Sequence, residues 1–350
     1  MSPELLSAAV TLGETLVGLN LSKGQFSKIF LGGGVFSRID FSQTDFRGAD
    51  LRETVFDQCN LEGALFGGAQ LRRAVFNQCQ LAHADFRSAN LHAAVLTECS
   101  AMHAQFAQAA LTMATLSKCK FDHASWREAN LEASVITQCS LLDVCADSAD
   151  WFHTSVLECD LTHLTWAHAT LRRTVFHNTA LAGKSFVGLT LEGCMFASSD
   201  LTGADFSAVP LRQCNFQSAK LDNANFSQAN APNSIFCQAS GTRVNFERAD
   251  LRQALFTGAL LNDSNFQGAN LYQAHFAGAQ LERCNFAACD LTYADFRHAK
   301  LIAADMRQAT MLRACLHGAA TEGAQMTDRK RALESDPDLA EAEAWQPLAG

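Results

Sequence analysis

The chain has 350 residues, a formal net charge of −9, and a composition that is 48% hydrophobic and 18% charged. No stretch approaches the run of about 20 apolar residues that a transmembrane helix needs. The N-terminus, Met1-Ser2-Pro3-Glu4, lacks the basic region of a signal peptide. We therefore expect a protein that binds no membrane and is cytoplasmic, or is secreted by a route that uses no signal peptide.

The first residues predict a short helix over residues 2–12. Ser2 is a favourable N-cap residue, Pro3 suits the first helical turn, and Glu4 lies near the positive end of the helix dipole. Because bare strand edges invite aggregation, we expect residues 1–19 to form a helical cap on the structure that follows.

An internal repeat begins at Leu21 and continues to Leu316. Most of the residues at every fifth position are large and apolar, with Leu at most positions ending in 1 and Phe at most positions ending in 6. Two residues earlier stands a small residue, usually Ala, as in Ala49-Asp50-Leu51. A period of five fits neither a helix nor a strand. It indicates a solenoid whose corners recur every five residues.

This A-(D/N)-L-x-x and A-x-F-x-x frame resembles the pentapeptide repeat family over residues 20–325. The resemblance implies an all-β fold, a right-handed quadrilateral β-helix with four pentapeptides in each 20-residue coil, and therefore about 15 coils. The cysteines give an independent sign of a 20-residue coil, because they recur at that interval in the small inward slot. The residues are Cys59, Cys79, Cys99, Cys119, Cys139 and Cys159.

Thirteen cysteines are many for one chain, but ten of them fall in the small inward slot. Free cysteine packs as a small hydrophobe, and neighbours one strand spacing apart are marginal for disulfide geometry. No C-x-x-C pair with zinc-finger spacing occurs. We predict reduced packing residues, with a disulfide framework or a zinc site as alternatives. The ten are Cys59, Cys79, Cys99, Cys119, Cys139, Cys159, Cys194, Cys214, Cys284 and Cys289.

The core pattern is disturbed in two places, residues 144–189 and 231–241. In the first, Val144 and Ala146 exchange small and large volumes, and Lys184 occupies an inward slot, from which it can extend outward. In the second, Ala231-Pro232 and Gly241 remove core volume on adjacent sides. Neutral drift explains both disturbances, and the alternative is a bend or dent that a partner uses.

The composition changes at Met326, so we predict a polar C-terminal tail, residues 326–350, that is partly helical or disordered. Asp336-Pro337 could start a second short helix. The alternative is a segment for docking or dimerisation.

The chain contains no P-loop, nucleophile elbow, H-E-x-x-H motif or dinucleotide fingerprint. We therefore predict a non-enzymatic protein without a cofactor. Four histidines and Asp143 recur every 20 residues at one outward position and, on stacked coils, would form a ladder whose histidines could hold a transition metal or charge together near pH 6. We predict no metal site, and the candidates are His83, His103, His123 and His163.

Residues for binding a partner are expected in three places: an arginine-rich side of the coil, the tryptophans of the first core disturbance, and the apolar residues of the tail. They are Arg72, Arg73, Arg172, Arg173, Arg212, Trp151, Trp166, Leu333, Leu339 and Trp345.

Pentapeptide repeat proteins include DNA mimics that bind type II topoisomerases and protect DNA gyrase. A duplex mimic needs closely spaced negative charge along its length. Here even the most acidic side, which contains Asp122, Asp143 and Asp160, also carries Lys120 and Lys220. Such a mixture is typical of a solvated surface, so gyrase binding is the alternative function and direct binding of nucleic acid is not expected.

The N-terminus also resembles pentapeptide segments encoded with bacterial type VI secretion systems, in which a short helix leads into G-x-x-L-x-G-x-x-L-S. The matching residues are Gly13, Leu16, Gly18, Leu21 and Ser22. In those systems the segment is taken for an accessory or effector-linked module. We predict a scaffold that binds another protein as such a component. A host-targeted effector fits the same residues.

Overall fold

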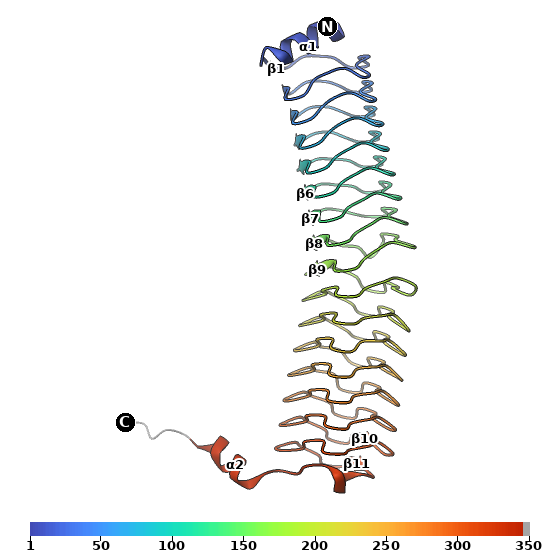
Figure 1. The fold of residues 1–350 in the computed structure, drawn as a ribbon, viewed down its shortest axis with the longest axis vertical. Coiled ribbons are helices and arrows are strands. Elements are labelled where there is room, and N and C mark those ends of the chain that lie inside the picture. The colour runs from blue at the N-terminus through green and yellow to red at the C-terminus, as the bar shows by residue number, and fades with distance from the viewer. Residues whose placement is uncertain (346–350) are drawn as a thin grey trace, which may run out of the picture. The chain divides into compact units, whose positions relative to one another are not determined.

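Residues Met1–Ala180 form one compact unit of stacked coils. In the computed structural model, which describes residues 1–345, each coil takes 20 residues and runs parallel to the next (Figure 1). One side of the coils is a nine-stranded parallel sheet whose strands follow sequence order, with Val55 opposite Val75. The strands are β1 (Thr15–Val17), β2 (Val35–Ser37), β3 (Val55–Asp57), β4 (Val75–Asn77), β5 (Val95–Thr97), β6 (Thr115–Ser117), β7 (Val135–Thr137), β8 (Ser155–Leu157) and β9 (Val175–His177).

The other three sides are joined by isolated parallel bridges. Examples are Asn60 with Gln80, Leu65 with Asp85, and Asp50 with Gln70. Four sides of five residues account for the 20-residue coil, so the predicted quadrilateral β-helix is confirmed.

Helix α1 (Pro3–Thr11) covers the N-terminal end of this unit, as predicted. The hydroxyl of Ser2 accepts a hydrogen bond from the N–H of Leu5 at 3.4 Å, and Leu6 and Val10 are buried. The Ser7 hydroxyl donates to the carbonyl of Phe30 at 2.8 Å, which fixes the helix on the coil below.

Most corners turn through a residue with a positive φ. At one corner the φ of His83 is 58°, and the N–H of Ala84 closes the turn by donating to the carbonyl of Leu81 at 3.0 Å. This is the geometry of a type II turn, whose third residue needs a positive φ. The side chain of that third residue projects from the corner, so residues 20 apart form an outward column.

The core consists of the Leu and Phe side chains that point inward from the four sides. Phe66 stacks on Phe86 with ring centroids 4.7 Å apart and planes at 4°, while Phe76 meets Phe86 edge to face at 6.0 Å. Both arrangements are favourable for aromatic rings. Each such side chain, when buried, contributes about 1.5–3 kcal/mol.

The Asp or Asn before the large residue closes a local turn. Asp45 Oδ1 accepts the N–H of Arg47 at 2.9 Å, and Asn60 Oδ1 accepts the N–H of Glu62 at 3.2 Å. Short Asx side chains favour this bond to the backbone two residues on. The A-(D/N)-L preference therefore has a physical cause on the outside of the coil.

The ten cysteines of the small inward slot are buried, and all thirteen cysteines are free thiols. In the corners that follow β4 and β5, the sulfurs of Cys79 and Cys99 donate to a carbonyl 23 residues earlier at 3.3 Å. In corners without such a strand, Cys214 and Cys289 lie closer to the equivalent carbonyl, at 2.9 and 2.8 Å. Burial raises the pKa of Cys214 to about 12, so its thiol stays protonated.

The second compact unit begins at Leu181. Its coils are joined mainly by isolated bridges, such as Leu255 with His275, and by one pair of short strands, β10 (Asp305–Met306) and β11 (Gln325–Met326). An amide ladder runs along one side, where each Nδ2 donates to the Oδ1 of the previous Asn at 3.2 Å. Its members are Asn225, Asn245, Asn265 and Asn285.

The residues after β11 first pair with the last coil, and the chain then continues into a helix. The 3-10 helix η1 (Arg329–Arg331) brings the carbonyl of Arg331 within 2.8 Å of the N–H of Arg313. The carbonyl of Leu333 accepts from Leu316 at 2.8 Å. Helix α2 (Pro337–Ala344) follows, capped by Asp336. Within residues 1–345, no helix has the length and apolar character needed to cross a membrane.

The first disturbance of the core pattern is absorbed inside the coils. Val144 and Ala146 are both fully buried, in agreement with an exchange of volumes. Trp151 is 0% and Trp166 5% exposed, so both rings replace the usual Leu or Phe as core residues. Lys184 is half-buried.

The second disturbance is partly filled by a shift of the chain. A Cβ on Gly241 would lie 2.8 Å from the backbone carbonyl carbon of Leu221 and 2.9 Å from Cγ2 of Val244. The backbone at Gly241 therefore occupies space that a side chain fills in other coils, and no larger residue fits there.

Candidate protein-interaction surface

The predicted histidine column forms a ladder at one corner of the Met1–Ala180 unit. The rings of His83 and His103 lie 4.9 Å apart at 2°, and those of His103 and His123 lie 4.9 Å apart at 12°. His123 Nδ1 lies 3.6 Å from the Asp143 carboxylate, and His163 lines a small pocket. The ring spacing exceeds the span of two Zn–N bonds, about 4.2 Å, so neighbouring rings do not share a metal ion in this arrangement.

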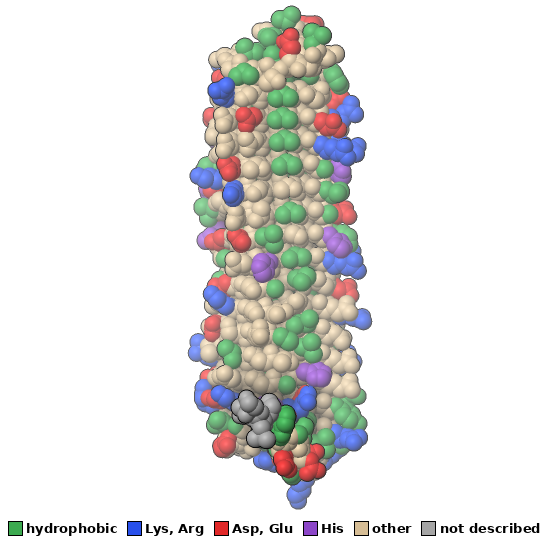
Figure 2. Space-filling view, turned by 90° about the vertical axis from the view of Figure 1, so that its left-hand side faces the viewer, with side chains coloured by type: hydrophobic (Ala, Val, Ile, Leu, Met, Phe, Trp, Pro, Cys, Tyr) green, Lys and Arg blue, Asp and Glu red, His purple; other side chains and the backbone are tan. Residues whose placement is uncertain are grey.

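A narrow apolar column runs over the sheet of the same unit. The first residues of four adjacent strands, Val35, Val55, Val75 and Val95, are paired in register. Figure 2 shows hydrophobic side chains in one line on this face, between polar side chains and backbone. Cross-strand pairs of this kind stabilise a sheet, which accounts for the column without a partner.

The predicted interface residues outside the arginine-rich side differ in exposure. Trp151 and Trp166 lie in the core, so their rings are not available to a partner. In the tail, Leu333 is 49%, Leu339 40% and Trp345 72% exposed.

An intramolecular fork between an arginine and an aspartate recurs on several sides of the coils, and Arg52 and Arg252 show it on the arginine-rich side. In Arg87 the Nε and Nη2 atoms donate to the two carboxylate oxygens of Asp85, two residues earlier, at 2.9 and 2.7 Å. Arg252 and Asp250 repeat this geometry at 2.8 and 2.7 Å. Arg47, Arg52, Arg297 and Arg307 form the same fork with Asp45, Asp50, Asp295 and Asp305.

Several predicted arginines stand in the same frame without this aspartate. In the first unit, the residue two positions before Arg72 is Gln70, and the residue two positions before Arg172 is Thr170. Arg172 instead lies over the Phe152 ring, with 5.3 Å from Cζ to the ring centroid.

Their neighbours in the chain make looser contacts. Arg73 lies 3.6 Å from the Glu53 carboxylate, and Arg173 Nη1 lies 3.4 Å from His153 Nε2.

Arg212, in the second unit, is exposed, and the residue two positions before it is Pro210. Among residues 1–345 no carboxylate lies within 4.0 Å of its guanidinium, so Arg212 is a cation without an ion-pair partner. It occupies the same column as Arg252, two coils away.

An open hollow of about 480 Å³ lies beside Arg212. It exists because Pro232 and Asn233, on the coil between Arg212 and Arg252, have short side chains. The lining residues are Arg212, Asn230, Pro232, Asn233, Arg252, Gln253 and Tyr272.

The hollow combines cations, amides and an aromatic ring. Tyr272 meets Tyr293 edge to face at 5.9 Å, and Arg313 lies over Tyr293 with Cζ 6.0 Å from the ring centroid. A second hollow of about 410 Å³ adjoins the first through Asn233 and Gln253. Arginine and tyrosine are enriched at the centres of protein interfaces, so this surface has the composition of a binding site.

Two sequence predictions meet in this hollow, Arg212 on the arginine-rich side and the core disturbance at 231–241. The sequence analysis treats these two features separately, and its predicted partner-binding residues do not include Arg252 or Tyr272. The sequence does contain the signal that joins them, because Pro210 stands where other arginines of this frame have an aspartate.

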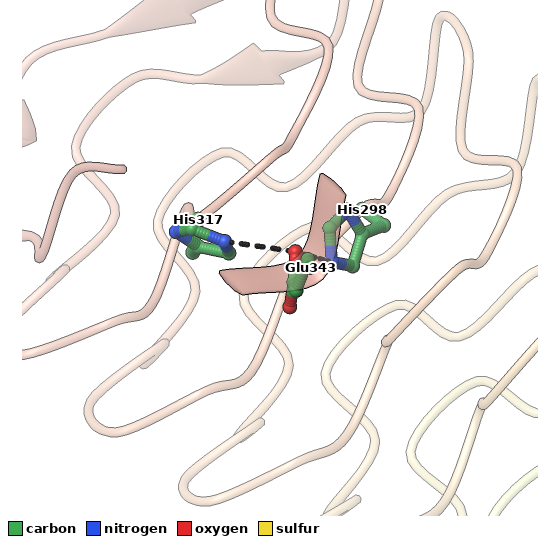
Figure 3. Close-up of side chains that lie close together, drawn as sticks. All are labelled: His298, His317 and Glu343. Atoms are coloured by element: carbon green, nitrogen blue, oxygen red, sulfur yellow. Dashed lines mark hydrogen bonds and ion pairs between the residues drawn. The ribbon is translucent and has the colours of Figure 1, made fainter. Parts of the chain in front are cut away.

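A third group of polar side chains lies at the end of the second unit (Figure 3). The Glu343 carboxylate of α2 lies 3.1 Å from His298 Nε2 and 3.2 Å from His317 Nε2. The hydrogen bond from His317 lowers the pKa of Glu343. The N–H of Asp336 donates to His317 Nδ1 at 3.0 Å.

That last bond assigns the tautomer of His317. Because Nδ1 accepts a hydrogen bond, the ring proton is on Nε2, where it is donated to Glu343. A ring in this form has no lone pair at Nε2 for a metal ion. In a metal-binding histidine, the ring N–H that is donated to a carboxylate belongs to the nitrogen that does not bind the metal. The cluster therefore holds α2 on the last coils and does not present three metal ligands.

The fold places the chain among the parallel β-solenoid proteins. A family model described as a pentapeptide repeat region matches residues 69–144 and 209–276, and a second, for pentapeptide repeats, matches residues 35–73, 185–217 and 289–328. The chain belongs to the pentapeptide repeat family, whose members are generally structural or interaction proteins.

Solved structures with similar repeats include HetL, a pentapeptide repeat protein involved in heterocyst differentiation regulation from the cyanobacterium Nostoc sp. strain PCC 7120. It is 21% identical, with 96% of this chain and 98% of HetL covered and a TM-score of 0.25. QnrB1, a plasmid-mediated fluoroquinolone resistance protein, is 19% identical over 51% of this chain and 88% of its own, with a TM-score of 0.33. At these identities and TM-scores, neither structure indicates what this chain binds. No curated protein matches the chain significantly.

Proposed function

We propose that this protein is a non-enzymatic scaffold that binds another protein through a side of its coils. The hollow beside Pro232 is the observation that supports this most directly. Arg52 and Arg252 on that side are paired with their own aspartates, whereas Arg212 has no carboxylate within 4.0 Å among the described residues and borders a concave surface with Arg252 and Tyr272.

The finer proposal is an accessory or effector-linked component of a bacterial type VI secretion system, acting in the cytoplasm or after secretion. Its support is the N-terminal sequence resemblance. Gly13 and Gly18 have φ values of 75° and 68°, and Leu16 and Leu21 are 8% and 7% exposed. These residues therefore serve the passage from α1 into the first coil, which any capped coil of this kind requires.

The alternative, mimicry of DNA toward gyrase, requires uncompensated negative charge along the surface. Six aspartates that could supply it are paired with arginines two residues later, as in Asp45–Arg47 and Asp305–Arg307. We therefore favour the scaffold, and the same experiment tests the mimic.

Site-specific photocrosslinking in the native cell tests the proposed function. A photoreactive residue at Asn233, on the rim of the hollow, should give an adduct with one major protein. The matched control is Met113, which occupies the equivalent corner of another coil and is 60% exposed. An adduct with a secretion component supports the finer proposal, an adduct with gyrase supports the mimic, and equal adducts from both positions contradict a site at the hollow.

A further inference from the structure

We propose that Arg212 is the centre of a docking site for an aspartate or glutamate side chain of the partner protein, seated in the hollow over Pro232. The inference rests on the proposed function and names the chemistry that the partner supplies.

The first reason is the geometry that this fold gives to arginine in the same frame. Where an aspartate stands two residues earlier, the guanidinium binds both carboxylate oxygens, as Arg252 binds Asp250 at 2.8 and 2.7 Å. Such bidentate pairs are the strongest that arginine makes with a carboxylate. Arg212 has the same place in the coil and lacks only the carboxylate, which a partner can supply.

The second reason is the cost of Pro210. At equivalent positions the backbone N–H bonds to the previous coil, from Asp50 to Ile29 at 2.8 Å and from Asp250 to Ala229 at 2.9 Å. Proline has no N–H to donate. Pro210 is exposed, so its ring is not a core residue whose burial would offset this loss. A residue that removes both a backbone hydrogen bond and the fork carboxylate keeps Arg212 available.

The third reason is the surface around the guanidinium. Pro232 leaves room for an incoming side chain, and the amides of Asn230 and Gln253 can both donate to and accept from a peptide backbone. Asp250 and Glu192 lie in the same part of this side and contribute negative charge. A single carboxylate is repelled less by these groups than a dianionic phosphate, which is why an acidic protein segment fits better than a phosphorylated one.

The test is fluorescence anisotropy of the full-length protein with a labelled peptide of alternating Asp and Gly, and with the same peptide carrying Asn in place of Asp. We expect the Asp peptide to bind more tightly, and Arg212→Gln to weaken its binding about ten-fold, as expected for loss of a charged hydrogen-bonded pair. Arg72→Gln is the matched control, because Arg72 also lacks an aspartate two residues earlier but borders no described hollow. It should leave the affinity unchanged.

A second variant tests the same proposal while it keeps Arg212. Pro210→Asp restores both the backbone N–H and the fork carboxylate, so Arg212 should pair internally. We expect thermal stability to be unchanged or higher and peptide binding to fall as in Arg212→Gln.

Three results would overturn the proposal: equal binding of the Asn peptide, equal losses in Arg212→Gln and Arg72→Gln, or competition by inorganic phosphate at lower concentration than acetate. If one of these occurs while the Asn233 crosslink persists, the scaffold stands and its partner uses a different chemistry. If the crosslink is absent as well, the proposed function fails with it.

Discussion

Threonine side chains in the small inward slot donate to a carbonyl 23 residues earlier. Thr154 donates to Leu131 at 2.7 Å, and Thr174 donates to Trp151 at 2.8 Å. Ser134 occupies the same column and is fully buried, yet its hydroxyl has no partner among the described residues. A buried hydroxyl without a hydrogen bond costs about 1–3 kcal/mol.

Ser134→Ala should therefore raise the free energy of unfolding by about 1 kcal/mol. Thr154→Ala, one coil away, should lower it by about 1–2 kcal/mol, because it removes a satisfied hydrogen bond and a buried methyl group. Urea unfolding with an unchanged slope measures both effects. If the two substitutions shift the midpoint in the same direction, the assignment of Ser134 as unsatisfied is wrong.

The forked aspartates predict how stability depends on pH. The hydrogen bond from Arg87 holds the pKa of Asp85 below its usual value of 3.8. A carboxylate whose pKa is depressed by folding stabilises the protein above its unfolded pKa, and this contribution is lost as the pH falls through the folded value. The melting temperature of Asp85→Asn should lie below that of the wild type at pH 6, and the difference should shrink as the pH falls below 3.8. A difference that stays constant down to pH 2 would contradict the role of the fork.

At the scale of the coil, the sequence predicts the fold because each pentapeptide repeats the same local physics. A large inward residue, a small slot and an Asx turn occur together, so the frame predicts sides of five residues, and the family resemblance together with the 20-residue interval of the cysteines predicts four such sides in each coil. The position of the three-residue strands was not predicted, because strand and bridge sides use the same frame. The hollow was predicted only in part, because pairing depends on the residue two before each arginine and not on how many arginines a side carries.

Helix α2 provides a test of how the C-terminal segment is held. Glu343 joins it to His298 and His317, whereas Glu341 in the same helix is exposed and makes none of the ion pairs of the described chain. Glu343→Ala should speed amide hydrogen exchange of residues 337–344 several-fold without changing residues 313–316. Glu341→Ala should change neither.

The tautomer of His317 adds a second expectation for this helix. Zn²⁺ should leave its exchange unchanged in the wild type, because His317 Nε2 carries the proton that Glu343 accepts. Slower exchange of residues 337–344 on addition of Zn²⁺ would show that the three side chains rearrange into a metal site.

At the scale of the whole chain, an open stack of coils leaves a strand edge at its end, and the first coil of the first unit and the last coil of the second unit are both covered. Helix α1 covers the first coil. In the second unit, residues 327–335 accept hydrogen bonds from backbone N–H groups of the last coil, which has no following coil to pair with them. These N–H groups belong to Gln308, Met311, Arg313, Leu316 and Gly318. The C-terminal segment is therefore two parts with different roles, an edge cover followed by a helix.

Two truncations separate these roles. A chain that ends at Ser335 keeps the edge cover and loses α2, so it should remain as monodisperse as the full-length protein in size-exclusion chromatography with light scattering. A chain that ends at Gln325 leaves the N–H groups of Arg313 and Leu316 unpaired on an open edge, which can add strands from another copy. It should associate into larger species, increasingly so with concentration. If both truncated chains match the full-length protein, residues 327–335 do not protect the edge. If the chain ending at Ser335 associates too, α2 is part of the cover.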